Sequence, residues 1–136
     1  MTPSRLNSLH AQLIAAGLDT LALVPGPNLR YLTGLSFHLS ERPILAFFAH
    51  ARGPAIVLPE LEAGKPAGAP FPMQVFAYGE DDASRTQAFQ RAADALGLAG
   101  ANIGVEGRRM RLLELRLLEA VAPGARFPFA ESVTAA

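Results

Sequence analysis

The chain has 136 residues, of which 50% are hydrophobic, and its 12 basic side chains balance its 12 acidic ones. This length and composition suit a single domain with one core. The balanced charge argues against nucleic acid as a partner, because proteins that bind nucleic acid carry a basic excess. The sequence contains no cysteine, which excludes disulfides, thiolate zinc sites and cysteine nucleophiles. No stretch approaches the roughly 18 apolar residues of a membrane span, so we expect no membrane partner and a cytoplasmic location.

The first part of the chain predicts a helix followed by a buried strand. Leucines and an alanine recur at helical spacing between residues 6 and 16, with Ser4 as the expected N-cap and Gly17 as the stop. Residues 20–24 form a short apolar run that ends at Pro25-Gly26-Pro27. Such a run predicts a buried strand that leads into a tight loop.

The middle of the chain predicts a hairpin and a further strand. Residues 44–49 and 55–58 are apolar, and the short segment between them, which includes His50, is expected to form an exposed turn between antiparallel strands. Residues 74–78 predict the next strand. The segment 64–72 is rich in glycine and proline, and we interpret it as an exposed loop within one domain.

The second half predicts alternating strands and helices. A helical stripe ends at Gly97, and the acidic residues 80–82 before it are interpreted as a helix cap rather than a cation site. Residues 102–105 predict a short strand, residues 110–121 a last helix, and residues 126–129 an edge strand, because Pro128 cannot donate a ladder hydrogen bond. Together the elements predict an α/β fold with three layers, in which helices flank a mixed β-sheet.

Residues that could carry chemistry are sparse. The three histidines, His10, His38 and His50, have no spacing that a helix or hairpin would turn into a ligand pair, so we expect no metal site. The glycines at positions 100, 104 and 107 do not match a phosphate-binding spacing and are expected to bracket a strand with turns. No serine lies in a G-x-S-x-G context. We therefore expect no catalytic residue in this chain.

The segment 28–43 is the exception, because it places two aromatic residues, a histidine, two arginines and a glutamate in a connection between strands. Loops on a rigid scaffold often carry binding groups. A structural interpretation is equally open. In that interpretation Asn28 caps a short helix, Tyr31 and Leu32 fill the core, Gly34 ends the helix, and Arg42 pairs with Glu41 in solvent.

The heptapeptide at residues 28–34, Asn-Leu-Arg-Tyr-Leu-Thr-Gly, resembles the N-x-x-Y-L-T-G signature of the N-terminal domain of creatinase/prolidase-type metallopeptidases, which include Xaa-Pro dipeptidases and aminopeptidases P. The resemblance implies that residues 1–136 form a single ribonuclease-H-like domain without catalytic activity. It further implies that a pita-bread catalytic domain, absent from this sequence, follows. The motif residues Asn28, Tyr31, Leu32, Thr33 and Gly34 would then be structural.

The resemblance also implies a function and partners. Two divalent metal ions would be held by two Asp, one His and two Glu of the other domain, and this chain would hold no cofactor. Its partners would be its own catalytic domain, further copies in a homo-oligomer and a small peptide substrate, with this domain contributing to oligomerisation and restricting access to the active site. Phe37, His38 and Arg42 are the candidates for a substrate-facing loop, with Arg42 as a fork for a carboxylate and His38 as a titratable donor.

A different class of function is a free-standing α/β binding or interaction module that dimerises through an exposed edge of the hairpin. An independent small enzyme has little support, because no nucleophile, metal set or acid and base pair emerges from the sequence.

Overall fold

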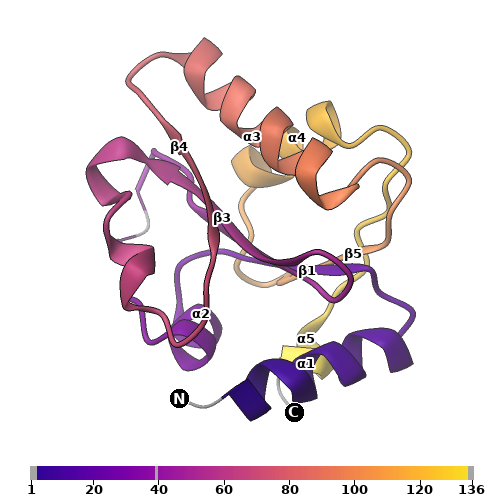
Figure 1. Ribbon diagram of the computed structural model, residues 1–136. Helices are drawn as coiled ribbons and strands as arrows, with labels where there is room; N and C mark the ends of the chain where they lie inside the picture. Colours follow the sequence, from indigo (N-terminus) through magenta and orange to yellow (C-terminus); the bar gives the residue numbers. More distant parts are fainter. Residues whose placement is uncertain (1–2, 39, 135–136) are drawn as a thin grey trace.

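A five-stranded mixed sheet lies between two layers of helices in the computed structural model, which describes residues 3–38 and 40–134 (Figure 1). Helices α3 and α4 cover one face of the sheet, and α1, α2 and α5 lie on the other side. The predicted three-layer α/β fold is therefore confirmed. Within the described residues, no helix is both long enough and apolar enough to cross a membrane.

The strands have the order β4-β3-β2-β1-β5 in the sheet. Their bounds are β1 Thr20–Leu23, β2 Leu45–Ala49, β3 Gly53–Pro59, β4 Gln74–Tyr78 and β5 Ile103–Val105. Strand β2 pairs antiparallel with both β1 and β3, whereas β1 with β5 and β3 with β4 are parallel pairs. All five strands predicted up to residue 105 are thus present.

The β2–β3 hairpin lies inside the sheet, because β1 pairs with its one side and β4 with the other. The expectation that the hairpin offers an exposed edge for dimerisation is therefore wrong, since both of its outer edges are already hydrogen-bonded. His50 in its turn is half-buried rather than exposed. Burial lowers the pKa of His10 on the first helix, and the nearby His50 lowers it further.

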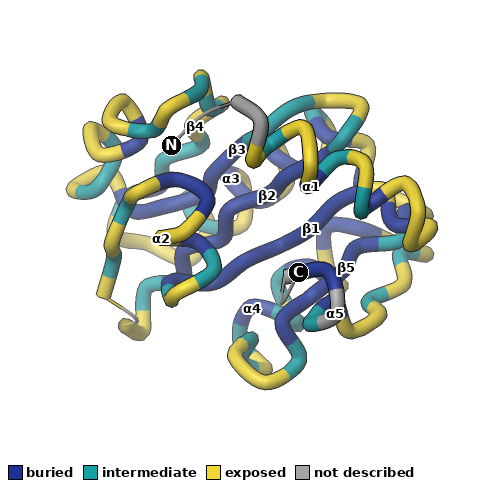
Figure 2. Tube along the Cα trace, turned by 90° about the horizontal axis from the view of Figure 1, so that it is seen from below, coloured by how far each residue is buried: buried dark blue, intermediate teal, exposed yellow. Residues whose placement is uncertain are grey.

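The core has two halves, one on each face of the sheet. Along β2, Phe47 points toward α3 and α4, whereas its neighbour Phe48 points toward α1 and α2, and both rings are fully buried. Figure 2 shows the central strands as buried along their length. Because helices cover both faces, the strands read as continuous apolar runs instead of alternating apolar and polar residues.

The helices are α1 Pro3–Ala15, α2 Pro27–Thr33, α3 Asp82–Leu96, α4 Leu112–Val121 and α5 Glu131–Thr134, with two 3-10 turns at Glu60–Glu62 and Lys65–Gly68. Because α1 begins at Pro3, Ser4 lies inside its first turn and the predicted N-cap at Ser4 is wrong. The acidic cap of α3 is confirmed, since Asp81 Oδ1 accepts a hydrogen bond of 2.6 Å from the backbone N–H of Ser84.

The segment 126–129 runs parallel to β5 but does not form the predicted edge strand. It makes only two isolated bridges, between Asn102 and Arg126 and between Val105 and Phe129. Gly104 lies within β5 rather than in a turn, and a Cβ there would come within 2.8 Å of the side chains of Leu18 and Ala130. The close packing of Leu18 and Ala130 against β5 therefore depends on the missing side chain.

Candidate functional site around helix α2

The carboxyl ends of β1 and β5 meet at one edge of the sheet, because these two strands are parallel neighbours. Beyond β1 the chain passes through Val24, Pro25 and Gly26 into α2, and Pro27 occupies the first turn of that helix, where its missing N–H has no intrahelical role. Beyond β5 the next residue is Glu106. The topology thus places α2 and Glu106 side by side although they are far apart in the sequence.

Glu106 holds the start of α2 through a buried hydrogen-bond network. Glu106 is 1% exposed, and its Oε1 accepts a 3.1 Å hydrogen bond from the backbone N–H of Val24. Its Oε2 accepts a 2.8 Å hydrogen bond from Asn28 Nδ2, and Arg109 Nε lies 3.9 Å from the same oxygen. Asn28 of the heptapeptide therefore links α2 to the end of β5.

Burial raises the pKa of Glu106 above its ordinary value, because desolvation disfavours the charged form. The hydrogen bonds from Asn28 and from the Val24 backbone oppose this shift, as does the charge of Arg109, whereas Glu131 adds to it. The carboxyl group is thus a buried acid whose ionisation is coupled to the position of α2.

Helix α2 buries one face and exposes the other. Leu29, Leu32 and Thr33 are buried, which is the i, i+3, i+4 pattern of a helix against a core. Tyr31 is two residues from Leu29 and lies on the opposite face, where it is 59% exposed. The core position predicted for Leu32 is confirmed, and the one predicted for Tyr31 is wrong because helical geometry turns the two residues apart.

The predicted N-cap of α2 is wrong, whereas the predicted end of the helix at Gly34 is confirmed. Asn28 lies inside the helix and its side chain binds Glu106, so it is not the N-cap. Gly34 ends the helix as expected, with φ of 74° and its N–H donating to Arg30 O at 2.7 Å. Thr33 Oγ1 donates to Leu29 O at 2.7 Å and accepts from the N–H of Leu35 at 3.0 Å.

A hollow of about 700 Å³ opens on the exposed side of α2. Arg5 of α1 reaches across it, donating from Nη1 to Tyr31 O at 2.9 Å, and its guanidinium lies 4.1 Å from the centroid of the Tyr31 ring. Arg30 also lines the hollow and is exposed. The other lining residues are Gly26, Pro27, Gly34, Ser36 and Phe37.

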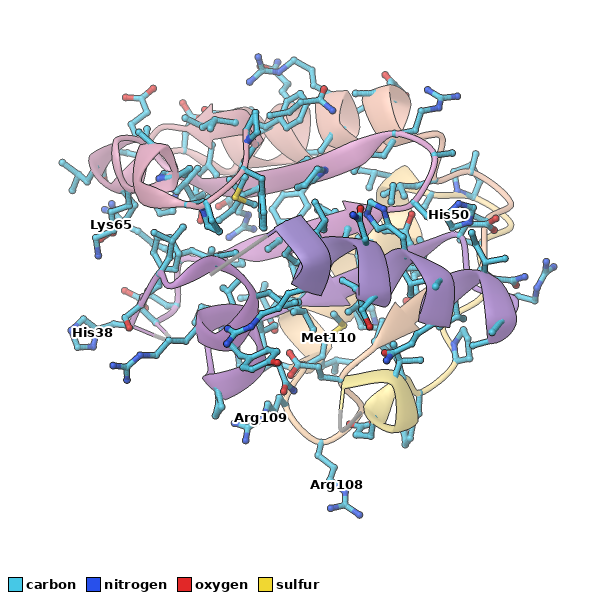
Figure 3. All side chains as sticks on the ribbon, turned by 60° about the horizontal axis from the view of Figure 1, so that its bottom comes forward. His38, His50, Lys65, Arg108, Arg109 and Met110 are labelled. Carbon is cyan, nitrogen blue, oxygen red and sulfur yellow. The ribbon has the colours of Figure 1, made fainter. Side chains whose placement is uncertain are left out.

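The three candidates for a substrate-facing loop lie in different surroundings. Phe37 is half-buried at the hollow, with Lys65 Nζ 5.1 Å from its ring centroid. His38 is exposed and projects from the side of the molecule (Figure 3). Arg42 pairs with Glu80 at 2.7 Å instead of the predicted Glu41. The structure brings only Phe37 to the hollow.

The sequence interpretation missed two buried glutamates. Glu106 directly follows a short buried strand, and an acidic residue in that position is a signal that could have drawn attention to it. Glu114 is fully buried on α4, where it accepts hydrogen bonds from the backbone N–H of Arg111 at 2.9 Å and from Arg111 Nε at 3.0 Å. This second glutamate fixes the start of α4 and has no contact with the hollow.

The resemblance assigns the two divalent metal ions to the other domain and none to this chain. Within residues 3–38 and 40–134, no group of three or more histidine, aspartate or glutamate side chains could hold a metal ion.

Residues 5–135 match the family described as the Creatinase/Prolidase N-terminal domain, and the chain belongs to this family. None of the curated proteins matches the sequence. Among solved structures, the dipeptidase PepE from Mycobacterium ulcerans is 31% identical with a TM-score of 0.79, over 96% of this chain and 34% of that one. The chain thus spans about a third of the length of that dipeptidase.

Two further structures share the fold at lower identity. The Creatinase/Prolidase N-terminal domain of an X-Pro dipeptidase from Streptococcus pyogenes is 19% identical with a TM-score of 0.79, and 96% of each chain is covered. A dipeptidase from Pyrococcus horikoshii OT3 is 22% identical with a TM-score of 0.81, over 95% of this chain and 35% of that one. The chain is thus similar both to isolated N-terminal domains and to the corresponding part of longer dipeptidases.

Proposed function

We propose that this chain is the non-catalytic N-terminal domain of a cytoplasmic metallopeptidase of the Xaa-Pro dipeptidase or aminopeptidase type. The observation that carries the proposal is the family match over residues 5–135, together with the coverage of only 34% of the M. ulcerans dipeptidase. In this proposal a second domain of the same protein holds two divalent metal ions and performs the hydrolysis. The present domain contacts that domain and further copies of the protein.

The same proposal gives the domain a role in restricting access of peptides to the active site. Support comes from the loop that follows α2, which carries the exposed His38 and an arginine, Arg42, that forms a solvent-accessible ion pair. The side-chain exposures in that pair are 42% for Arg42 and 80% for Glu80, so the guanidinium is free to exchange its partner for a substrate carboxylate.

The first experiment separates the two parts of the protein. The 136-residue chain and the longer protein containing it are each assayed on Xaa-Pro dipeptides with manganese, cobalt or zinc. We expect turnover only from the longer protein, because the metal ligands belong to the other domain. Turnover by the purified 136-residue chain, surviving a second purification, would contradict the proposal.

The second experiment tests the loop in the longer protein. Arg42→Ala is expected to lower kcat/KM for dipeptides. The loss should correspond to about 1.5–3 kcal/mol of transition-state stabilisation, the usual size of a hydrogen bond to a charged group. Arg116→Ala is the matched control, since Arg116 also forms an exposed ion pair, with Glu119 on α4. Equal effects of the two substitutions on kcat/KM would remove Arg42 from the substrate-facing loop.

The third experiment tests access. Phe37→Ala and His38→Ala are compared in the longer protein on dipeptides and on longer peptides with the same first two residues. If the loop restricts entry, these truncations should raise the relative kcat/KM for the longer peptides. If His38 senses bound substrate, His38→Ala should also change the pH profile near neutrality. An unchanged length preference in both variants would contradict the restriction of access.

A further inference from the structure

We propose that the hollow beside α2 binds a carboxylate attached to an apolar group, such as the C-terminus of a short peptide with an apolar last residue. This site is separate from the candidate loop residues His38 and Arg42, which do not line the hollow. The proposal goes beyond the function proposed above and does not rest on it, because binding can be measured on this chain without any catalytic domain.

Three arginines bring positive charge to the hollow. Arg5 and Arg30 line it directly. Arg109 lies beside the lining residue Gly26, since Arg109 Nη1 is 3.5 Å from the position that a Cβ on Gly26 would occupy. None of the residues that line the hollow is acidic. The chain as a whole has no net charge, so the lining of the hollow is more basic than the chain on average.

The guanidinium groups keep donors available for a ligand. Arg30 forms no hydrogen bond or ion pair with any residue that the structure describes. Arg5 uses one donor, Nη1, for Tyr31 O, and its guanidinium carbon lies 4.1 Å from the centroid of the Tyr31 ring. Arg109 Nε lies 3.9 Å from Glu106 Oε2, which is beyond hydrogen-bond distance, and its side chain is 48% exposed. A planar guanidinium with free N–H groups suits a carboxylate, which it binds in a bidentate manner.

The walls of the hollow favour an organic acid over a bare anion. The rings of Tyr31, Phe37 and Pro27 line it, and Gly26 and Gly34 contribute no side chain that would fill it. The volume of about 700 Å³ lies in the range of small-molecule sites, roughly 300–1,000 Å³, and accommodates a short peptide. An apolar group attached to the carboxylate would gain from contact with these rings, whereas inorganic phosphate would lose hydration without that gain.

The sequence provides a local reporter for binding. The chain contains no tryptophan and only two tyrosines, Tyr31 and Tyr78. Tyr78 is 3% exposed, and its hydroxyl donates to Pro43 O at 2.7 Å, so a ligand has little access to it. A change in tyrosine fluorescence on binding therefore reports on Tyr31 in the hollow. The isolated S. pyogenes domain was solved by itself, which supports use of the 136-residue chain in the test.

The test titrates the chain with N-acetyl-leucine and with N-acetyl-leucine amide at constant ionic strength. The two probes have the same apolar group and differ in the carboxylate. We expect a saturable fluorescence change with the acid and none with the amide. Chemical shifts of the backbone amides of residues 26–37 should move with the same midpoint. They should still move in Tyr31→Phe, which removes the fluorescent reporter but keeps the ring.

The variants assign the binding to the arginines. Arg30→Gln is expected to weaken binding of N-acetyl-leucine about tenfold, the effect of losing roughly 1.4 kcal/mol of charge-assisted hydrogen bonding, without changing the melting temperature. Arg116→Gln, an exposed arginine of α4, is the matched control and should bind as the unmodified chain does. Arg30→Lys should fall between the two, since it keeps the charge and loses the planar fork.

Several outcomes would overturn the proposal. Equal binding of the acid and the amide would show that the carboxylate is not recognised. Equal loss in Arg30→Gln and Arg116→Gln would place the ligand elsewhere. Competition by inorganic phosphate at the same concentration as the acid would mean that the apolar walls contribute nothing, and the site would then be a general anion site.

Discussion

Helix α2 and the loop that follows it are adjacent in the sequence but are held in different ways. The helix is anchored by buried leucines and by the carboxylate of Glu106, which is 1% exposed. The loop 35–43 is held by contacts at the surface, among them a 3.3 Å hydrogen bond from Lys65 Nζ to Ser36 O and the exposed Arg42–Glu80 pair. Among the described residues, Phe37 packs against the core and the Tyr78 hydroxyl donates a buried hydrogen bond to Pro43 O.

This difference separates a structural part of the segment from a part that is available for binding. Buried hydrogen bonds are expensive to break, because the remaining partner is left unsatisfied, whereas exposed ion pairs contribute little to stability. Substitutions of the buried anchoring residues should therefore lower the free energy of unfolding. Substitutions in the surface part should change binding and leave the fold intact.

Among substitutions in helix α2, its Glu106 anchor and the loop, the largest effect is expected for Glu106→Ala, which removes both acceptors of the network. The Val24 N–H and the Asn28 amide lose their partner in a buried environment, at a cost of about 2–4 kcal/mol in the free energy of unfolding. Urea denaturation of the variant measures this loss. Glu119→Ala, at an exposed ion pair, is the control and should cost less than about 1 kcal/mol. Similar losses in both variants would mean that α2 is not anchored through Glu106.

The second prediction concerns the pH dependence of that anchor. A carboxyl group whose pKa is higher in the folded state binds its proton more tightly there, so it favours folding below its ordinary pKa of 4.5. This contribution is lost as the pH rises through the folded-state pKa. Glu106→Gln lacks the ionisation, so the stability of the variant relative to the unmodified chain should improve from pH 4.5 upward. Urea denaturation at several pH values checks the direction, and a constant difference would contradict it.

A small effect on stability is expected for Tyr31→Ala, although this residue belongs to the family motif. Its ring is 59% exposed and contacts the Arg5 guanidinium, an interaction worth about 0.5–1 kcal/mol at an exposed site. Phe47→Ala is the comparison, because that ring is fully buried and its truncation should cost about 3–5 kcal/mol. Thermal unfolding of both variants distinguishes an exposed ring from one in the core.

The smallest effect is expected for Arg42→Ala, whose loss in unfolding free energy should stay below about 0.5–1 kcal/mol and shrink further in high salt. The same loss should follow Glu80→Ala, and the double variant should show almost no additional change. A loss of several kcal/mol would show that the loop 35–43 is part of the scaffold rather than a surface available to a ligand.

Much of the fold could be predicted from the sequence, because apolar runs bounded by glycine and proline mark the strands and helical spacing marks the helices. Strand β5 and the acidic cap at Asp81 were found in this way. The role of 126–129 was less accessible. Pro128 signals an edge position, but whether the segment pairs continuously or by isolated bridges depends on how it meets β5.

The sequence by itself determined the succession of the five strands and the long helices along the chain, the two-sided burial of the sheet and the helix-ending role of Gly34. Each follows from local periodicity or from the backbone freedom of one residue. The tertiary structure alone decided the partners of charged side chains. Glu106 meets Asn28 and Arg42 meets Glu80 across 78 and 38 residues. Such pairs arise where parallel strands and separate helices end at one edge of a sheet. The local sequence around each residue does not indicate which distant residue will lie beside it.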